Sequence, residues 1–128
     1  MFTLRVQNKF SAAHKLVGYP GDCANLHGHT WKVEVAISGY ALNDLDMLVD
    51  FRDVKKVMKK VICLLDHSYL NEVLEVDLPT AEYLAWYIYS IISSKLEGLD
   101  LPEDIKLKEV TVWESDNASV TYDGVEYE

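Results

Sequence analysis

The sequence predicts an α+β fold in which an antiparallel sheet of four strands carries two helices on one face. Two observations predict it. Strand-like alternation of apolar and polar residues occurs at both ends of the chain, and two stretches with helical spacing lie between them. The expected order is therefore ββααββ. Residues 1–128 are enough for a single domain with one core and too few for two.

The first two strands frame a loop. Residues 2–13 alternate loosely and residues 29–37 alternate cleanly, as half-buried antiparallel strands do. Residues 17–25, VGYPGDCAN, have the composition of a loop. We expect the two strands to pair as a hairpin.

Both helices begin at a capping residue. Asp50 is a candidate N-cap for a helix that ends near residue 64, and Thr80 is one for a helix that ends near Leu96. Apolar residues at helical spacing give each helix a buried face: Val54, Val57, Met58, Val61 and Ile62 in the first, and Leu84, Ala85, Ile88, Ile91 and Ile92 in the second. Residues 66–79 between the helices are expected to form a connection.

The last two strands are expected over residues 105–114 and 118–126, joined by the turn SDNA. An open four-stranded sheet exposes unpaired backbone groups along both edge strands. Pairing of these edges between subunits, into a ring or barrel, would satisfy them. We therefore expect a homo-oligomer.

The composition argues against two classes of partner. The formal net charge is −9, whereas a nucleic-acid backbone or an anionic membrane surface needs a cationic binding surface. A local cluster of Lys and Arg can still bind a small anionic substrate. No run of about 20 apolar residues is present to span a membrane, and the N-terminus lacks the pattern of a signal peptide. We expect a cytoplasmic protein whose two cysteines, Cys23 and Cys63, are reduced.

Three of the four histidines are spaced for metal binding. His27 and His29 lie two residues apart on an extended segment, so their side chains point to the same face. His14, at the end of the first strand, reaches the same place if the two strands pair. Three histidines with an open fourth position are the pattern of a catalytic zinc site. The alternative is three ordinary, half-buried or solvent-facing histidines.

Other residues have two or more possible roles. Cys23 precedes His27 by four positions and is a fourth metal ligand, a thiol acting as base or nucleophile beside the metal, or a plain loop cysteine. Asp66 and His67 combine a carboxylate with an imidazole, which suits proton shuttling, but they also fit a polar helix end. Glu114 is either exposed at the end of its strand or directed into a pocket, where it accepts hydrogen bonds from a ligand.

Six short motifs carry a resemblance that covers nearly the whole chain: FSAAH (10–14), C-x-x-x-HGH (23–29), MLVDF (47–51), LDHSYLN (65–71), PTAE (79–82) and WES (113–115). In this order and spacing the sequence resembles the 6-pyruvoyltetrahydropterin synthase family. The resemblance implies the tunnelling fold, a ββααββ unit that closes edge to edge into a trimeric barrel and often stacks into a hexamer.

The resemblance also implies a catalytic site. Zn²⁺ is expected on three histidines, His14, His27 and His29. Cys23 is then a catalytic base, and Asp66 with His67 completes a proton relay across a subunit interface.

Four residues are candidates for substrate binding. By resemblance, Glu114 holds the guanidine-like edge of a pterin, and Thr80 with Glu82 matches a further motif at the pterin pocket, although both fit a helix start equally well. Lys15, next to His14, is a candidate for attracting a polyphosphate.

Three residues separate the cysteine from HGH, and this spacing is similar to that of one branch of the family. That branch makes 6-carboxytetrahydropterin for queuosine or archaeosine synthesis. That branch converts 7,8-dihydroneopterin triphosphate and releases triphosphate and acetaldehyde. The alternatives are tetrahydrobiopterin-type chemistry, which keeps the side chain, and a non-catalytic zinc-stabilised module with Cys23 as a ligand. One departure is Asp46-Met47, where the family often has a glycine. We expect it to alter a turn and leave the chemistry intact.

Overall fold

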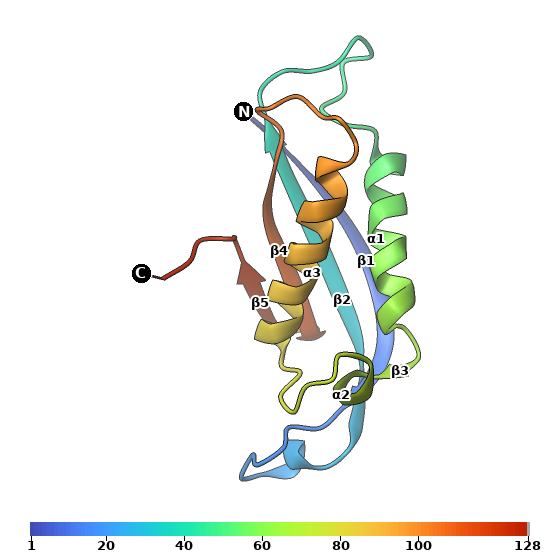
Figure 1. Ribbon diagram of the computed structural model, residues 1–128, viewed down its shortest axis with the longest axis vertical. Helices are drawn as coiled ribbons and strands as arrows, with labels where there is room; N and C mark the ends of the chain where they lie inside the picture. The colour runs from blue at the N-terminus through green and yellow to red at the C-terminus, as the bar shows by residue number, and fades with distance from the viewer. Residues whose placement is uncertain (128) are drawn as a thin grey trace.

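The structure, a computed structural model, describes residues 1–127. Its elements follow the predicted order with three short additions, η1, β3 and α2: β1 (Phe2–His14), η1 (Asp22–Ala24), β2 (His27–Gly39), α1 (Phe51–Leu65), β3 (Ser68–Tyr69), α2 (Leu70–Val73), α3 (Ala81–Glu97), β4 (Lys106–Ser115) and β5 (Ala118–Tyr122). Figure 1 shows α1 and α3 side by side on one face of the sheet. The predicted α+β class is therefore confirmed.

The sheet has five strands, so the expectation of four was wrong. Its order is β3-β1-β2-β4-β5, and β3 pairs with β1 in parallel at Ala12 and Ala13. The extra strand arises where α1 ends, because Asp66 Oδ1 accepts the backbone N–H of Ser11 and His67 N donates to Ser11 O. These contacts align the next two residues with β1. A two-residue strand is too short to leave an alternating pattern in the sequence.

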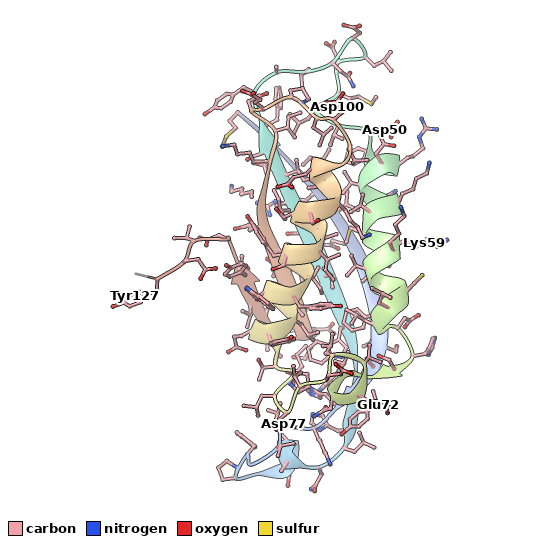
Figure 2. All side chains as sticks on the ribbon, in the orientation of Figure 1. Asp50, Lys59, Glu72, Asp77, Asp100 and Tyr127 are labelled. Atoms are coloured by element: carbon pink, nitrogen blue, oxygen red, sulfur yellow. The ribbon has the colours of Figure 1, made fainter. Side chains whose placement is uncertain are left out.

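Both predicted helix caps are confirmed. The Asp50 side chain accepts the backbone N–H of Arg52 at 2.8 Å, and Thr80 Oγ1 accepts that of Tyr83 at 3.1 Å. Each such cap contributes about 1 kcal/mol to helix stability. The lysines of α1 lie on its outer side, and Figure 2 shows Lys59 directed away from the sheet.

The core lies between the sheet and the two long helices. It includes buried residues of the two central strands, such as Val33, Val35 and Val112, which pack against Leu84 and Ile88 of α3. Burying one such side chain contributes about 1.5–3 kcal/mol.

Aromatic packing anchors the end of the hairpin that bears the histidines. Phe10 and Trp31 are opposite one another in the β1–β2 register, and both are almost fully buried with their rings stacked 6.0 Å apart. Alternation then places His14 and His29 on this same covered face. A buried, stacked aromatic pair therefore lies next to the histidines in the same hairpin.

Two turns explain smaller differences from the sequence-based expectation. The last strand ends at Tyr122 instead of residue 126, because Gly124 turns the chain with φ 82° and packs on the Tyr89 ring. Asp46, where the family often has glycine, adopts a left-handed φ of 58°. Its N–H donates to Asn43 O, so hydrogen bonding holds the turn that a glycine would adopt freely.

The opposite face of the sheet has no helix over it among residues 1–127, and it is polar. Arg5 contacts Glu34 at 3.2 Å and Glu109 at 3.3 Å, and Gln7 donates to Glu34 at 2.9 Å. The sheet edges are also largely open, because β3 covers β1 at two residues only.

Within the described part of the chain, no helix is long and apolar enough to cross a membrane. Cys23 and Cys63 are free thiols, as expected.

Candidate metal centre and active site

Three histidine side chains meet on the covered face of the β1–β2 hairpin. The register pairs His14 directly with His27 and places His29 opposite Ala12. Their ring centroids lie 4.5 Å (His14–His27), 5.1 Å (His14–His29) and 4.9 Å (His27–His29) apart. The three residues thus converge as their spacing predicted.

Backbone carbonyls orient two of the rings. His14 Nδ1 lies 2.9 Å from Pro79 O, and His27 Nδ1 lies 2.7 Å from Asn25 O. A carbonyl oxygen can only accept, so each Nδ1 carries the proton and each Nε2 keeps a free lone pair. This is the usual way in which a protein prepares a histidine to bind a metal.

The Nε2 atoms of all three histidines are buried, and among residues 1–127 none has a hydrogen-bond partner. The free lone pairs of His14 and His27, withdrawn from water beside the His29 nitrogen, are costly unless a cation satisfies them. Burial also lowers the pKa of His29 below its ordinary value of 6.5, an effect that Glu114 partly opposes. Neutral histidine is the form that binds metal. The cluster therefore fits a divalent ion such as zinc.

Glu114 completes the group. Its Oε1 lies 3.2 Å from His29 Nε2, and one ligand atom from each of the four residues lies within 4.8 Å of all the others. The side chain is 35% exposed. Alternation along β4 places it on the covered face with Val112, and a β-bulge leaves it unpaired with β5: Trp113 pairs with Ser119 and Ser115 with Ala118, so Glu114 is the extra residue between them.

The structure gives Cys23 a different position from the metal group. The residue lies half-buried in η1, and its carbonyl accepts the backbone N–H of Leu16 at 2.8 Å. Within residues 1–127 the converging ligand atoms come from the three histidines and Glu114, without Cys23.

Asp66 and His67 form a second charged group at the outer edge of β1. Asp66 Oδ2 lies 3.6 Å from His67 Nε2, and His67 has a left-handed φ of 54°. Such a conformation is unfavourable for a residue with a side chain, and at functional sites it often serves to direct that side chain. The His67 ring is exposed beside a hollow on the uncovered face of the sheet, lined in part by Ser11, Ala13 and Thr30. Among the residues described, no hydrogen bond or ion pair joins this pair to the histidine cluster, although His29 also lines the hollow.

The remaining predicted site residues lie around the start of α3 and the end of β1. Thr80 follows Pro79, the residue that orients His14, and its side chain caps the helix. Glu82 and Lys15 are exposed.

Asn71 is a supporting residue that the sequence did not reveal. Its side chain accepts the backbone N–H of Lys15 at 3.0 Å, donates to Lys15 O at 2.8 Å and donates to Asp77 O at 3.4 Å. The only signal was its place as the last residue of LDHSYLN.

Comparisons with known proteins identify the family of the chain. The sequence model of the 6-pyruvoyl tetrahydropterin synthase family matches residues 3–125. The 6-carboxy-5,6,7,8-tetrahydropterin synthase of Aquifex aeolicus is 31% identical over 121 residues, covering 78% of this chain and 75% of that protein. The dihydroneopterin monophosphate aldolase of Pyrococcus furiosus is 36% identical over 111 residues, covering 87% and 88%.

A solved structure shares the fold over almost its full length. The 6-pyruvoyl tetrahydropterin synthase of Caenorhabditis elegans matches with a TM-score of 0.83 and 27% identity, covering 97% of this chain and 96% of that one. The family match spans all six motifs together with the histidine cluster, and the resemblance seen in the sequence is confirmed. The chain belongs to the 6-pyruvoyl tetrahydropterin synthase family.

Proposed function

We propose that the protein is a zinc-dependent pterin synthase that converts 7,8-dihydroneopterin triphosphate to 6-carboxy-5,6,7,8-tetrahydropterin, with release of triphosphate and acetaldehyde. The product would enter 7-deazaguanine synthesis, towards queuosine or archaeosine. The observation that carries the metal assignment is the set of three buried, unpartnered Nε2 atoms. The choice of reaction is supported by the cysteine-to-HGH spacing and by the Aquifex relative.

His14, His27 and His29 would hold the zinc. When bound, the ion would polarise the hydroxyl groups of the substrate side chain and make the adjacent C–H groups more acidic. The backbone carbonyls on Nδ1 of His14 and His27 would keep those rings fixed while the substrate exchanges.

Cys23 would act as the base that removes a proton from a side-chain carbon, and His67 would return one, with Asp66 Oδ2 3.6 Å from its Nε2. Within residues 1–127 of one chain, Asp66 and His67 lie at the edge of β1 and form no hydrogen bond or ion pair with the cluster, which supports a relay completed by a neighbouring subunit. The open edges of β1 and β5 are suited to that assembly, a trimer or a dimer of trimers.

Glu114 would accept hydrogen bonds from the N–H groups of the pterin ring, with Thr80 and Glu82 nearby. A carboxylate facing two adjacent N–H donors makes a short, charge-assisted pair. Lys15, exposed directly after His14, would attract the triphosphate.

Two other reactions have specific support. The Pyrococcus relative, an aldolase acting on dihydroneopterin monophosphate, matches more of the chain than the Aquifex relative does. Tetrahydrobiopterin-type chemistry would eliminate triphosphate and keep all three side-chain carbons. Incubation with dihydroneopterin triphosphate and, separately, with the monophosphate, followed by mass spectrometry of the pterin and assay of acetaldehyde, separates the three. A pterin that retains its three side-chain carbons would exclude our assignment.

The first variants to compare are Cys23→Ala and His27→Ala. We expect Cys23→Ala to keep its zinc and lose turnover, because the thiol lies outside the converging ligand atoms. His27→Ala should lose both, since one of three nitrogen ligands is gone. Metal analysis and product formation on the same samples provide the test. If Cys23→Ala lost its zinc, the thiol would be a ligand and the alternative of a zinc-stabilised module would gain support.

A further inference from the structure

The carboxylate of Glu114 contacts His29 and has no Lys or Arg side chain paired with it to balance its negative charge among residues 1–127. Glu114 Oε1 lies 3.2 Å from His29 Nε2, and among residues 1–127 this carboxylate forms no ion pair with Lys or Arg. By contrast, Glu109, on the same strand but the opposite face, pairs with Arg5 at 3.3 Å. The carboxylate of Glu114 is therefore directed at a nitrogen of the metal site and at no fixed cation.

That contact cannot remain unchanged when a metal binds unless the metal takes part in it. A histidine nitrogen that donates its lone pair to an ion carries no proton, so it offers nothing to a neighbouring carboxylate oxygen. Two lone-pair-bearing atoms at 3.2 Å repel unless a cation lies between them.

The distance matches a shared ion. In a tetrahedral site with bonds of about 2.0–2.1 Å, neighbouring ligand atoms lie about 3.3 Å apart. The observed 3.2 Å between Oε1 and Nε2 agrees with that edge, and the other ligand atoms of the group are within 4.8 Å.

We propose that Glu114 is a displaceable fourth ligand, which closes the metal site in the substrate-free enzyme and leaves the ion when substrate oxygens bind. The inference rests on the metal centre of the proposed function and is independent of which pterin product forms. The exchange is a ligand substitution: a carboxylate oxygen leaves the metal and a hydroxyl oxygen of the substrate takes its place, with no change of oxidation state.

Two features suit Glu114 to this exchange. Its side chain is 35% exposed, so it has room to leave, whereas His14 is buried and fixed by Pro79. The bulge at Glu114 leaves it without a pairing partner on β5, which frees its backbone from the ladder. Once displaced, the carboxylate is available to accept the N–H groups of the pterin ring. Binding of the pterin ring by Glu114 is then linked to the opening of a coordination position on the metal.

The test measures metal binding without turnover. Zinc affinity is determined by chelator competition for the wild type, Glu114→Gln and Glu114→Ala, with Glu109→Gln as the matched control on the same strand. We expect both Glu114 variants to bind zinc about tenfold or more weakly, and the Glu109 variant to stay within about twofold of the wild type. Thermal unfolding of the metal-free proteins verifies that each variant is folded.

Cobalt substitution gives a second readout. The visible spectrum of bound Co²⁺ reports its coordination, so Glu114→Gln should change it and Glu109→Gln should leave it unchanged. Addition of a pterin with a dihydroxylated side chain should alter the wild-type spectrum as the carboxylate leaves. Unchanged zinc affinity together with an unchanged cobalt spectrum in Glu114→Gln would overturn the proposal. If the Glu114 variants lose affinity but the wild type makes no 6-carboxytetrahydropterin, the proposed reaction fails and the ligand assignment stands.

Discussion

Asn71 holds together two backbone segments on which His14 depends. Its side chain binds both backbone groups of Lys15, the residue after His14, and also reaches Asp77 O. Asp77 lies two residues before Pro79, whose carbonyl orients the His14 ring. One amide therefore fixes the end of the strand that carries the ligand and the loop that aims it. Such supporting contacts commonly account for a 10- to 100-fold change in metal affinity.

We therefore expect Asn71→Ala to weaken zinc binding by about tenfold. Asn71→Asp should be intermediate, because a carboxylate still accepts from Lys15 N but cannot donate to Lys15 O. Chelator competition measures both, with Asn8→Ala as a control, since within residues 1–127 the Asn8 side chain accepts a hydrogen bond from the N–H of Lys9 alone. If Asn71→Ala bound zinc with wild-type affinity, the hydrogen bonds of Asn71 to Lys15 and Asp77 would not be needed for metal binding.

The parts of the site predicted from the sequence are those set by local geometry. Alternation along a strand fixes where His27 and His29 point, and hairpin pairing adds His14. The supporting groups were not predictable in the same way. Pro79 O and Asn25 O act through backbone carbonyls, which every residue has. Alternation along β4 places Glu114 on the covered face, but the bulge that leaves it unpaired with β5 has no signature in residue type.

At the scale of elements, Asp104 joins two loops far apart in the chain. Its Oδ2 accepts the backbone N–H groups of Tyr40 at 2.8 Å and Ala41 at 3.2 Å. Asp104 lies just before β4, whereas Tyr40 directly follows β2. These hydrogen bonds from the backbone favour the charged carboxylate and lower the pKa of Asp104 below its ordinary 3.8.

The pH dependence of this contact has a definite sign. A carboxyl group with a lowered pKa in the folded state stabilises the fold above its unfolded pKa, and this contribution is lost as the pH falls through the lower, folded-state value. Asp104→Asn should therefore lower the unfolding temperature most at pH values well above the ordinary 3.8, and the difference should shrink as the pH falls below that value. Thermal unfolding of wild type and variant across this range measures it. A difference that stays constant with pH would mean that the charge of Asp104 is irrelevant.

The long elements were predictable and the short ones were not. The caps at Asp50 and Thr80 have a residue-type signature and precede clear apolar stripes, so both helices begin where expected. In contrast, β3 forms because Asp66 and His67 bind the backbone of Ser11. Asp66 and Ser11 are 55 residues apart in the chain. A contact of that separation is decided by tertiary packing, and local sequence does not record it.

At the scale of the whole molecule, the proposed function divides the active site between subunits. Cys23 lies in the loop between β1 and β2, whereas His67 is exposed at the opposite edge of β1 beside the uncovered face. If neighbouring subunits supply the two groups, two inactive variants should restore each other when they assemble together.

We expect this complementation from Cys23→Ala and His67→Ala. Each is inactive alone, but subunits dissociated, mixed in equal amounts and reassembled should recover about a quarter of the wild-type turnover, because a quarter of the interfaces combine an intact Cys23 with an intact His67. Enzyme assay before and after mixing, with light scattering to verify the assembled mass, is the measurement. Activity that stays at the level of the separate variants would place both groups in one chain.

The direct pairing of His14 with His27 has a consequence for folding. A slip of one residue between β1 and β2 would turn one strand over and send its histidines to the opposite face. A hairpin mispaired in this way cannot present all three nitrogens to one ion, so zinc would stabilise only the correct alignment. During folding, metal binding would then favour the correct pairing of β1 and β2 over the mispaired hairpin. This role would precede any part of the metal in catalysis.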